Sequence, residues 1–194
     1  MKRLNRSRRI AHVFTDGHLV FGGMRLRCTL GRTGIVADKR EGDGGTPVGL
    51  FPVRHVHFRN RAGRPRTLLP ATPVLRSHGW CDDPGHPRYN RFVRLPFPAR
   101  HEKLWRGDRL YDCLIVLGQN DRPAVPERGS AVFVHVMSPA AEPTEGCVAL
   151  QPGDLRRLLV LLRPGDLFRI HSPGGKTPAF PLRRACIPQT AMVG

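Results

Sequence analysis

The stretch that most constrains how this chain folds runs from Gly129 to Leu150. Residues 131–137 are apolar and rich in β-branched side chains, which is typical of a strand. The two-residue period of a strand puts valines on one face and predicts the other face as Ala131, Phe133, His135 and Met137. His135 is therefore the one polar side chain of an otherwise apolar strand.

A cysteine follows this strand at short range. The loop Pro139 to Pro143 ends the strand, and Gly146 then gives the backbone freedom to present Cys147 at the start of a second apolar run. A thiol with a pKa of roughly 8.5 is only slightly ionised at neutral pH, and a neighbouring imidazole can accept its proton. Backbone N–H groups at Gly146 and Cys147 would face a developing oxyanion. The pattern predicts a Cys/His nucleophile pair.

The same two residues also fit a purely structural interpretation. A buried cysteine commonly acts as a small apolar side chain, and a lone histidine on a strand is commonly a core residue with satisfied hydrogen bonds. For an isolated cysteine and an isolated histidine, this interpretation is the commoner one.

The surrounding residues favour the catalytic interpretation. His135 followed by Thr144-Glu-Gly-Cys-Val-Ala-Leu150 resembles the signature of the L,D-transpeptidase catalytic domain, the YkuD family. That signature has a histidine, a variable loop, Ser/Thr-x-Gly-Cys, an aliphatic residue, an arginine and another aliphatic residue. Three features depart from it: Ala149 replaces the arginine, Val136 replaces a glycine that often follows the histidine, and the loop is short. The change at 149 concerns the usual substrate contacts and leaves the Cys/His chemistry intact.

A second stretch resembles the same family. Its members carry Thr-Pro-x-Gly-x-Phe before an early strand, and Thr46, Pro47, Gly49 and Phe51 match in order. Alone this is a turn-like signal. Two ordered motifs about a hundred residues apart, the usual span of one domain, extend the resemblance over roughly residues 11–171.

The resemblance implies a mostly β fold, a sandwich or open barrel with one helix packed after the cysteine. We expect a basic segment at residues 1–10, the catalytic domain at 11–171 and a tail at 172–194. The expected helix begins near Pro152, has Asp154 in its first turn and ends before Pro164. Its leucines recur at helical spacing and form one apolar face: Leu155, Leu158, Leu159 and Leu162.

The activity implied by the resemblance is acyl transfer on peptidoglycan stem peptides. Cys147 would attack the carbonyl before the terminal D-alanine, His135 would move the proton, Gly146 would help hold the oxyanion, and Thr144 would contact substrate. An amine acceptor would give a cross-link or an exchange product, whereas water would give a carboxypeptidase. No cofactor or metal is implied, and carbapenems are the expected class of inhibitor.

Residues 59–109 exceed the length of an ordinary loop, which indicates an insertion or lid. Trp80 and Tyr89 within it either stack on sugar or peptide, or pin the segment to the core. Asn120, after an apolar run at 110–117, either positions substrate or serves a turn. The sequence leaves each pair of alternatives open.

The charge is +17, with 32 Lys and Arg against 15 Asp and Glu. Either a codon bias towards arginine or a polyanionic partner explains this excess. No nucleic-acid-binding motif accompanies it and the basic residues are scattered, so nucleic acid is not the expected partner. A non-catalytic basic module that binds the envelope or nucleic acid is the remaining alternative.

Five widely spaced cysteines, without Cys-x-x-Cys or paired histidines at ligand spacing, predict no zinc site and at least one free thiol. The basic start is not followed by the apolar run of about 7 to 15 residues that a signal peptide needs, and no run approaches the ~20 residues of a membrane-spanning helix. The family works in the cell envelope, so the resemblance and the absent leader point to different compartments.

Overall fold

The computed structural model describes residues 9–60 and 63–174. Most of the predicted basic segment at 1–10 and of the predicted tail at 172–194, Cys186 included, lies outside the described residues. The fold is mostly β, as predicted. The elements in chain order are β1 Ile10–Phe14, β2 His18–Phe21, β3 Met24–Thr29, β4 Ile35–Val36, β5 Thr46–Pro47, β6 Gly49–Phe58, β7 Ala71–Pro73, β8 His78–Cys81, β9 Arg91–Arg94, β10 His101–Lys103, β11 Cys113–Leu117, β12 Phe133–Val136, β13 Val148–Leu150, α1 Pro152–Leu161 and β14 Leu167–Ile170.

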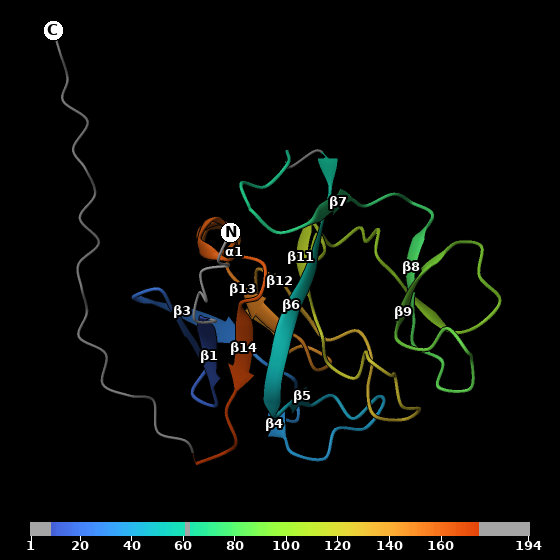
Figure 1. Ribbon diagram of the computed structural model, residues 1–194, viewed down its shortest axis with the longest axis horizontal. Helices are drawn as coiled ribbons and strands as arrows, with labels where there is room; N and C mark the ends of the chain where they lie inside the picture. The colour runs from blue at the N-terminus through green and yellow to red at the C-terminus, as the bar shows by residue number, and fades with distance from the viewer. Residues whose placement is uncertain (1–8, 61–62, 175–194) are drawn as a thin grey trace, which may run out of the picture.

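The main sheet closes on itself. Its strand order is β11-β12-β13-β3-β2-β1-β14-β6-β7, and β11 also pairs with β6. The long strand β6 makes this closure, because residues 49–52 pair with β14 and residues 53–58 pair with β11. Figure 1 shows β6 running between these neighbours. The predicted open barrel is thus a closed, barrel-like sheet, mostly antiparallel, with parallel pairs at β1/β14, β12/β13 and β6/β7.

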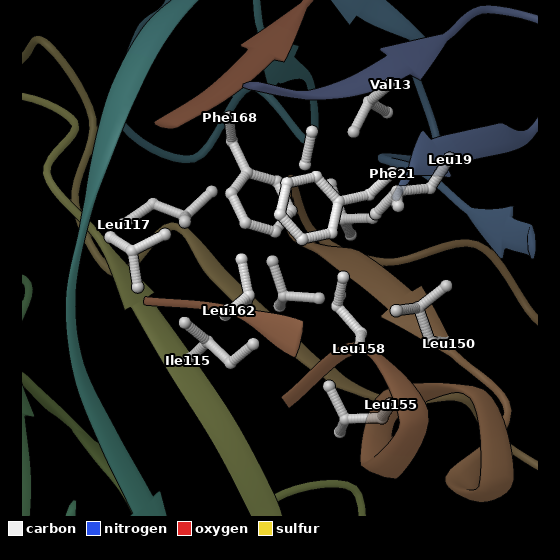
Figure 2. Close-up of a cluster of buried hydrophobic side chains, with 14 of the residues drawn as sticks. Val13, Leu19, Phe21, Ile115, Leu117, Leu150, Leu155, Leu158, Leu162 and Phe168 are labelled. Carbon is white, nitrogen blue, oxygen red and sulfur yellow. The ribbon is translucent and has the colours of Figure 1, made fainter. Parts of the chain in front are cut away.

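The interior of this sheet is one apolar cluster to which every strand of the ring contributes. The helix α1 adds its apolar face to it, as the leucine spacing predicted, and Pro152 stands at its first position. Figure 2 shows helix leucines meeting strand residues in this cluster, among them Leu155, Leu158, Leu162, Val13, Ile115 and Phe168. Burying these side chains is the main favourable contribution to folding.

The outer face of β12 carries a second, smaller cluster. Phe133, Leu114 and Cys147 are buried there together with Leu104 and Tyr111, which come from the segment before β11. Residues 78–103 form a separate three-stranded sheet, β10-β8-β9, that stands beside the barrel (Figure 1). The predicted insertion therefore packs against the outside of the closed sheet.

Two predicted strands are shorter than expected. The run at 131–137 is a strand only from Phe133 to Val136, because Ala131 has a positive φ of 51° and leaves the extended conformation. The run at 110–117 is a strand only from Cys113. The predicted alternation holds, since Val132 and Val134 face the interior cluster and Phe133 faces the outer one.

Candidate active site

The register of two neighbouring strands brings the cysteine and the histidine to one face. β12 and β13 run parallel, with Val134 opposite Val148 and His135 opposite Ala149. Side chains alternate along each strand, so His135, Ala149 and Cys147 all leave the sheet on its outer side. Each of the three lines the same cleft, whose volume is about 530 Å³.

The walls of this cleft come from four parts of the chain. The loop before β5 contributes Lys39 and Glu41, and the inserted segment contributes Asp82, Glu102 and Arg106. Gly42 also comes from the loop before β5, and Leu110 and Tyr111 come from the segment before β11. The remaining lining residues lie around β12 and β13 and in the loop between them: Ser130, Ala131, Ser138, Glu142, Pro143, Thr144 and Glu145. The cleft is thus richer in acidic than in basic side chains, although the chain as a whole is strongly basic.

The Cys147 thiol is buried and held by the backbone. Its sulfur accepts a hydrogen bond from Phe133 N at 3.3 Å, and its S–H donates to Ala131 O at 3.2 Å. Burial and the nearby Glu102 carboxylate raise the pKa of Cys147 to about 12, against the lowering effects of the Phe133 N–H, Lys39 and Arg106. Without a ligand in the cleft, the thiol is therefore protonated at neutral pH.

The His135 imidazole has a fixed orientation. Its Nδ1 lies 2.8 Å from Val136 O, which can only accept, so Nδ1 carries the proton and Nε2 is the basic nitrogen of the neutral ring. Burial lowers its pKa to about 4. Tyr111 packs edge-on against the ring at 5.3 Å. A neutral imidazole with an open Nε2 is the form that can accept a proton from a thiol.

Two charged residues of the inserted segment hold Tyr111 in place. Tyr111 Oη donates to Glu102 Oε1 at 2.6 Å, and the Arg106 guanidinium lies 5.0 Å from the centre of the tyrosine ring. Arg106 forms ion pairs with Asp108 at 2.5 Å and with Glu102 at 3.4 Å. This network links the insertion to the histidine through the tyrosine ring.

The loop before the cysteine is held through the Cys147 carbonyl. Thr144 Oγ1 donates to Cys147 O at 2.7 Å and accepts from Gly146 N at 3.1 Å. Gly146 has φ +129°, and a Cβ there would stand 2.8 Å from Gly45 O. The sequence predicted that the Gly146 N–H would face an oxyanion, but in this structure it donates to Thr144 Oγ1. The Thr144 hydroxyl, predicted to contact substrate, bonds to the backbone of its own loop.

The second sequence motif meets the first at this carbonyl. Thr46 Oγ1 accepts from Gly31 N at 2.8 Å and donates to Cys147 O at 3.3 Å. Phe51 closes over Gly49, where a Cβ would stand 2.4 Å from the phenyl ring. The Thr-Pro-x-Gly-x-Phe stretch therefore supports the loop that precedes Cys147.

A model of the YkuD family, the L,D-transpeptidase catalytic domain, matches residues 3–170. The chain belongs to this family. A search of curated proteins gives no match. Among solved structures, the chain is similar to an L,D-transpeptidase from Mycobacterium smegmatis at 14% identity and a TM-score of 0.37; the similarity covers 84% of this chain and 58% of that one.

Within this YkuD domain, three residues expected at the substrate lie away from the cleft. Trp80 Nε1 donates to Asn90 Oδ1 at 2.9 Å, and its ring packs edge-on against Phe133 at 5.2 Å. Tyr89 is buried and its hydroxyl donates to Glu41. Both contacts fit the alternative in which these aromatic residues pin the insertion to the core.

Asn120 has a turn role in the structure. Its Nδ2 donates to Val125 O and Gly129 O, both at 2.9 Å, and its Oδ1 accepts from Val125 N at 2.8 Å. Its φ is +46°, a conformation that asparagine tolerates better than most residues. The side chain thus closes the 120–129 loop and does not line the cleft.

Sequence reasoning missed the charged residues of the YkuD cleft, chiefly Lys39, Glu102 and Arg106. One signal was available for Lys39, because it is one of four lysines in an arginine-rich chain and stands four residues before Asp43 of the Thr-Pro stretch. Glu102 and Arg106 carry no such signal, since only the packing of the insertion brings them to the strands.

The described cysteines form no disulfide bond with one another. Cys28, Cys81, Cys113 and Cys147 are free thiols in the part of the chain that the structure describes. No helix within residues 9–60 and 63–174 is long and apolar enough to cross a membrane.

Proposed function

We propose that this protein is a cysteine-dependent L,D-transpeptidase that acts on peptidoglycan tetrapeptide stems in the cell envelope through a thioester acyl-enzyme. The observation that carries the proposal is the shared cleft face of Cys147 and His135. The histidine there has its Nδ1 committed to Val136 O, and within residues 9–60 and 63–174 no hydrogen bond engages its Nε2, which can therefore act as the base. Membership of the YkuD family supports the same reaction class.

The proposed reaction has two halves. In the first, His135 Nε2 takes the thiol proton while Sγ attacks the carbonyl that precedes the terminal D-alanine. The carbon–nitrogen bond then breaks, the imidazolium returns its proton to the leaving amine, and a thioester remains on Cys147. In the second half, an amine from another stem attacks the thioester carbonyl and gives a proton to His135. The carbon–sulfur bond then breaks, the cross-linked product leaves, and the imidazolium returns the proton to Sγ.

The pKa values of the resting site indicate when the proton moves. A thiol with a pKa of about 12 beside an imidazole with a pKa of about 4 rests as a neutral pair at pH 7. The resting thiol also donates to Ala131 O, so it must break this contact to reach a substrate carbonyl. Proton transfer is therefore expected to accompany the attack on the bound carbonyl.

The experiment that tests the proposal is incubation of the purified protein with disaccharide-tetrapeptide, followed by product mass analysis. Wild-type protein is expected to form dimers with loss of one D-alanine, and Cys147→Ala is expected to form none. Cys113→Ala is the matched control, because it removes a thiol that is outside the cleft.

Two other outcomes would change the conclusion. Cysteine-dependent tripeptide without dimers would make the enzyme a carboxypeptidase, with water as the acceptor. Absence of any cysteine-dependent product, together with no carbapenem adduct on Cys147, would contradict catalysis and favour a binding module.

A further inference from the structure

Lys39 is a buried lysine whose side chain extends along two glycines towards the nucleophile. It is 8% exposed and lies in the loop between β4 and β5. Its stem lies against Gly129, where a Cβ would stand 2.8 Å from Lys39 Cγ. Its Nζ ends 3.5 Å from the point where a Cβ on Gly146 would stand. The fold thus leaves space for the ammonium group beside the residue that precedes Cys147.

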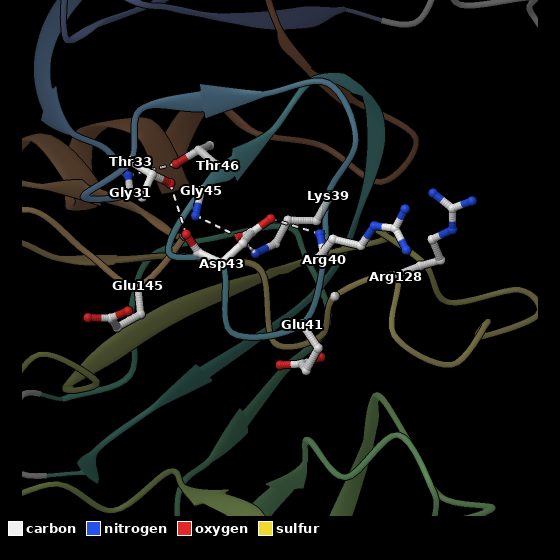
Figure 3. A network of polar contacts seen from close by, with 12 residues as sticks. Gly31, Thr33, Lys39, Arg40, Glu41, Asp43, Gly45, Thr46, Arg128 and Glu145 are labelled. Atoms are coloured by element: carbon white, nitrogen blue, oxygen red, sulfur yellow. Dashed lines mark hydrogen bonds and ion pairs between the residues drawn. The ribbon is translucent and has the colours of Figure 1, made fainter.

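The Lys39 ammonium group is held in place by one carboxylate, which leaves some of its N–H donors unpaired within the described part of the chain. It forms an ion pair with Asp43, whose carboxylate also accepts from Arg40 N at 2.7 Å and Gly45 N at 2.8 Å. Figure 3 shows Lys39 and Asp43 meeting beside Gly45, below Thr46 in this view. Across residues 9–60 and 63–174, this is the one hydrogen bond given by Nζ, and an ammonium has three donors. Donors therefore remain for a negative group in the cleft.

Two other groups that could offer a positive charge or an N–H beside Cys147 are already paired. Arg106 is paired with Asp108 and Glu102, and the Gly146 N–H is donated to Thr144. Position 149 faces the cleft but is an alanine, so it brings no charge.

The charged groups that act on the thiol have opposite signs. Glu102 raises the pKa of Cys147, and Lys39 and Arg106 lower it. The other titratable groups that line the cleft are His135, Tyr111, Glu41, Asp82, Glu142 and Glu145. Among the described residues, Lys39 is paired with one carboxylate, whereas Arg106 is paired with two.

We propose that Lys39 stabilises the negative charge that forms at Cys147, first on the thiolate and then on the oxyanion of the carbonyl under attack. Lys39 stays protonated throughout, and the thiol proton goes to His135 Nε2. The inference rests on the proposed function only in taking Cys147 as the reactive thiol. It assigns to a loop lysine the positive charge that position 149 does not supply.

The test measures how fast the Cys147 thiol reacts with an alkylating reagent. Cys147 is alkylated with iodoacetamide over a range of pH, and the modified peptide is followed by mass spectrometry, because other cysteines also react. An opposite charge within about 4–6 Å shifts a pKa by roughly 1–3 units. Lys39→Met is therefore expected to slow alkylation of Cys147 at pH 8 by about tenfold or more, and to slow it at each higher pH tested. Lys103→Met, an exposed lysine at the end of β10, is expected to match the wild type.

A double variant separates the charge of Lys39 from its structural contact. Lys39→Met alone leaves the Asp43 carboxylate without its cation, whereas Lys39→Met/Asp43→Asn removes both charges and retains an acceptor for Arg40 N and Gly45 N. Slow alkylation in the double variant supports the proposal. Wild-type alkylation in either variant overturns it. Alkylation needs no stem peptide, so a wild type that does not cross-link stems would contradict the proposed function without changing this result.

Discussion

Two threonine side chains hold the backbone of Cys147 by hydrogen bonds to its carbonyl oxygen. Thr46 and Thr144 both donate to this oxygen, and they come from two motifs that lie far apart in the sequence. Hydrogen bonds of this kind each contribute on the order of 1 kcal/mol, and more is lost when a buried acceptor is left unpaired. The two threonines therefore fix where the sulfur stands, although neither touches it.

Gly146→Ala tests how strictly this loop is shaped. The residue has φ +129°, and the added Cβ would stand 2.8 Å from Gly45 O, so the loop must shift. We expect a loss of stability of about 1–3 kcal/mol and a large loss of acylation by carbapenem. Thermal unfolding and adduct mass measure these effects. Gly153→Ala, where nothing lies within 4 Å of the added Cβ, is the control; equal behaviour of the two variants would contradict the prediction.

At the scale of elements, α1 is positioned by its apolar face. Leu155, Leu158 and Leu159 are buried in the interior cluster, and the helix follows directly after β13, the strand that begins one residue after Cys147. The helix therefore supports the strand from the side opposite the cleft.

Leu158→Ala is expected to lower the free energy of unfolding by about 2–5 kcal/mol, because it leaves a cavity in the interior cluster. Val160→Ala, on the exposed face of the same helix, is expected to change it by less than about 0.5 kcal/mol. Urea titration followed by circular dichroism measures both. A similar loss in the two variants would mean that the helix face does not support the core.

At the scale of the whole molecule, buried histidines make stability depend on pH. Burial lowers the pKa of His57 and of His135 to about 4, below the ordinary value near 6.5. Between these values the unfolded chain binds protons that the folded chain does not, so stability falls as pH drops from about 6.5 to about 4. Each histidine is expected to contribute up to about 3 kcal/mol to this loss.

The His57→Gln variant tests this pH dependence. It removes one of the histidines whose pKa is lowered to about 4, so its stability is expected to fall less steeply between pH 6.5 and pH 4 than that of the wild type. Urea midpoints measured at half-unit pH steps give the two slopes. Equal slopes would show that His57 does not take part.

The sequence by itself determined the local features of this protein. The two-residue alternation of 131–137 predicted which face of the strand carries His135, and the leucine spacing with Pro152 predicted the helix. The two motifs predicted the family. These features depend on side-chain period, turn residues and caps, which act over a few residues and can be read from the chain.

Only the tertiary structure decided how the sheet closes and which charges reach the cleft. Closure depends on β6 pairing with β14 through one half and with β11 through the other, a long-range choice that no local pattern encodes. Trp80 and Tyr89 looked available for stacking in sequence, but each finds a polar partner and a packed position in the fold. Lys39, Glu102 and Arg106 meet Cys147 because distant segments pack together, and packing of this kind is fixed by burial of the whole chain rather than by any single stretch.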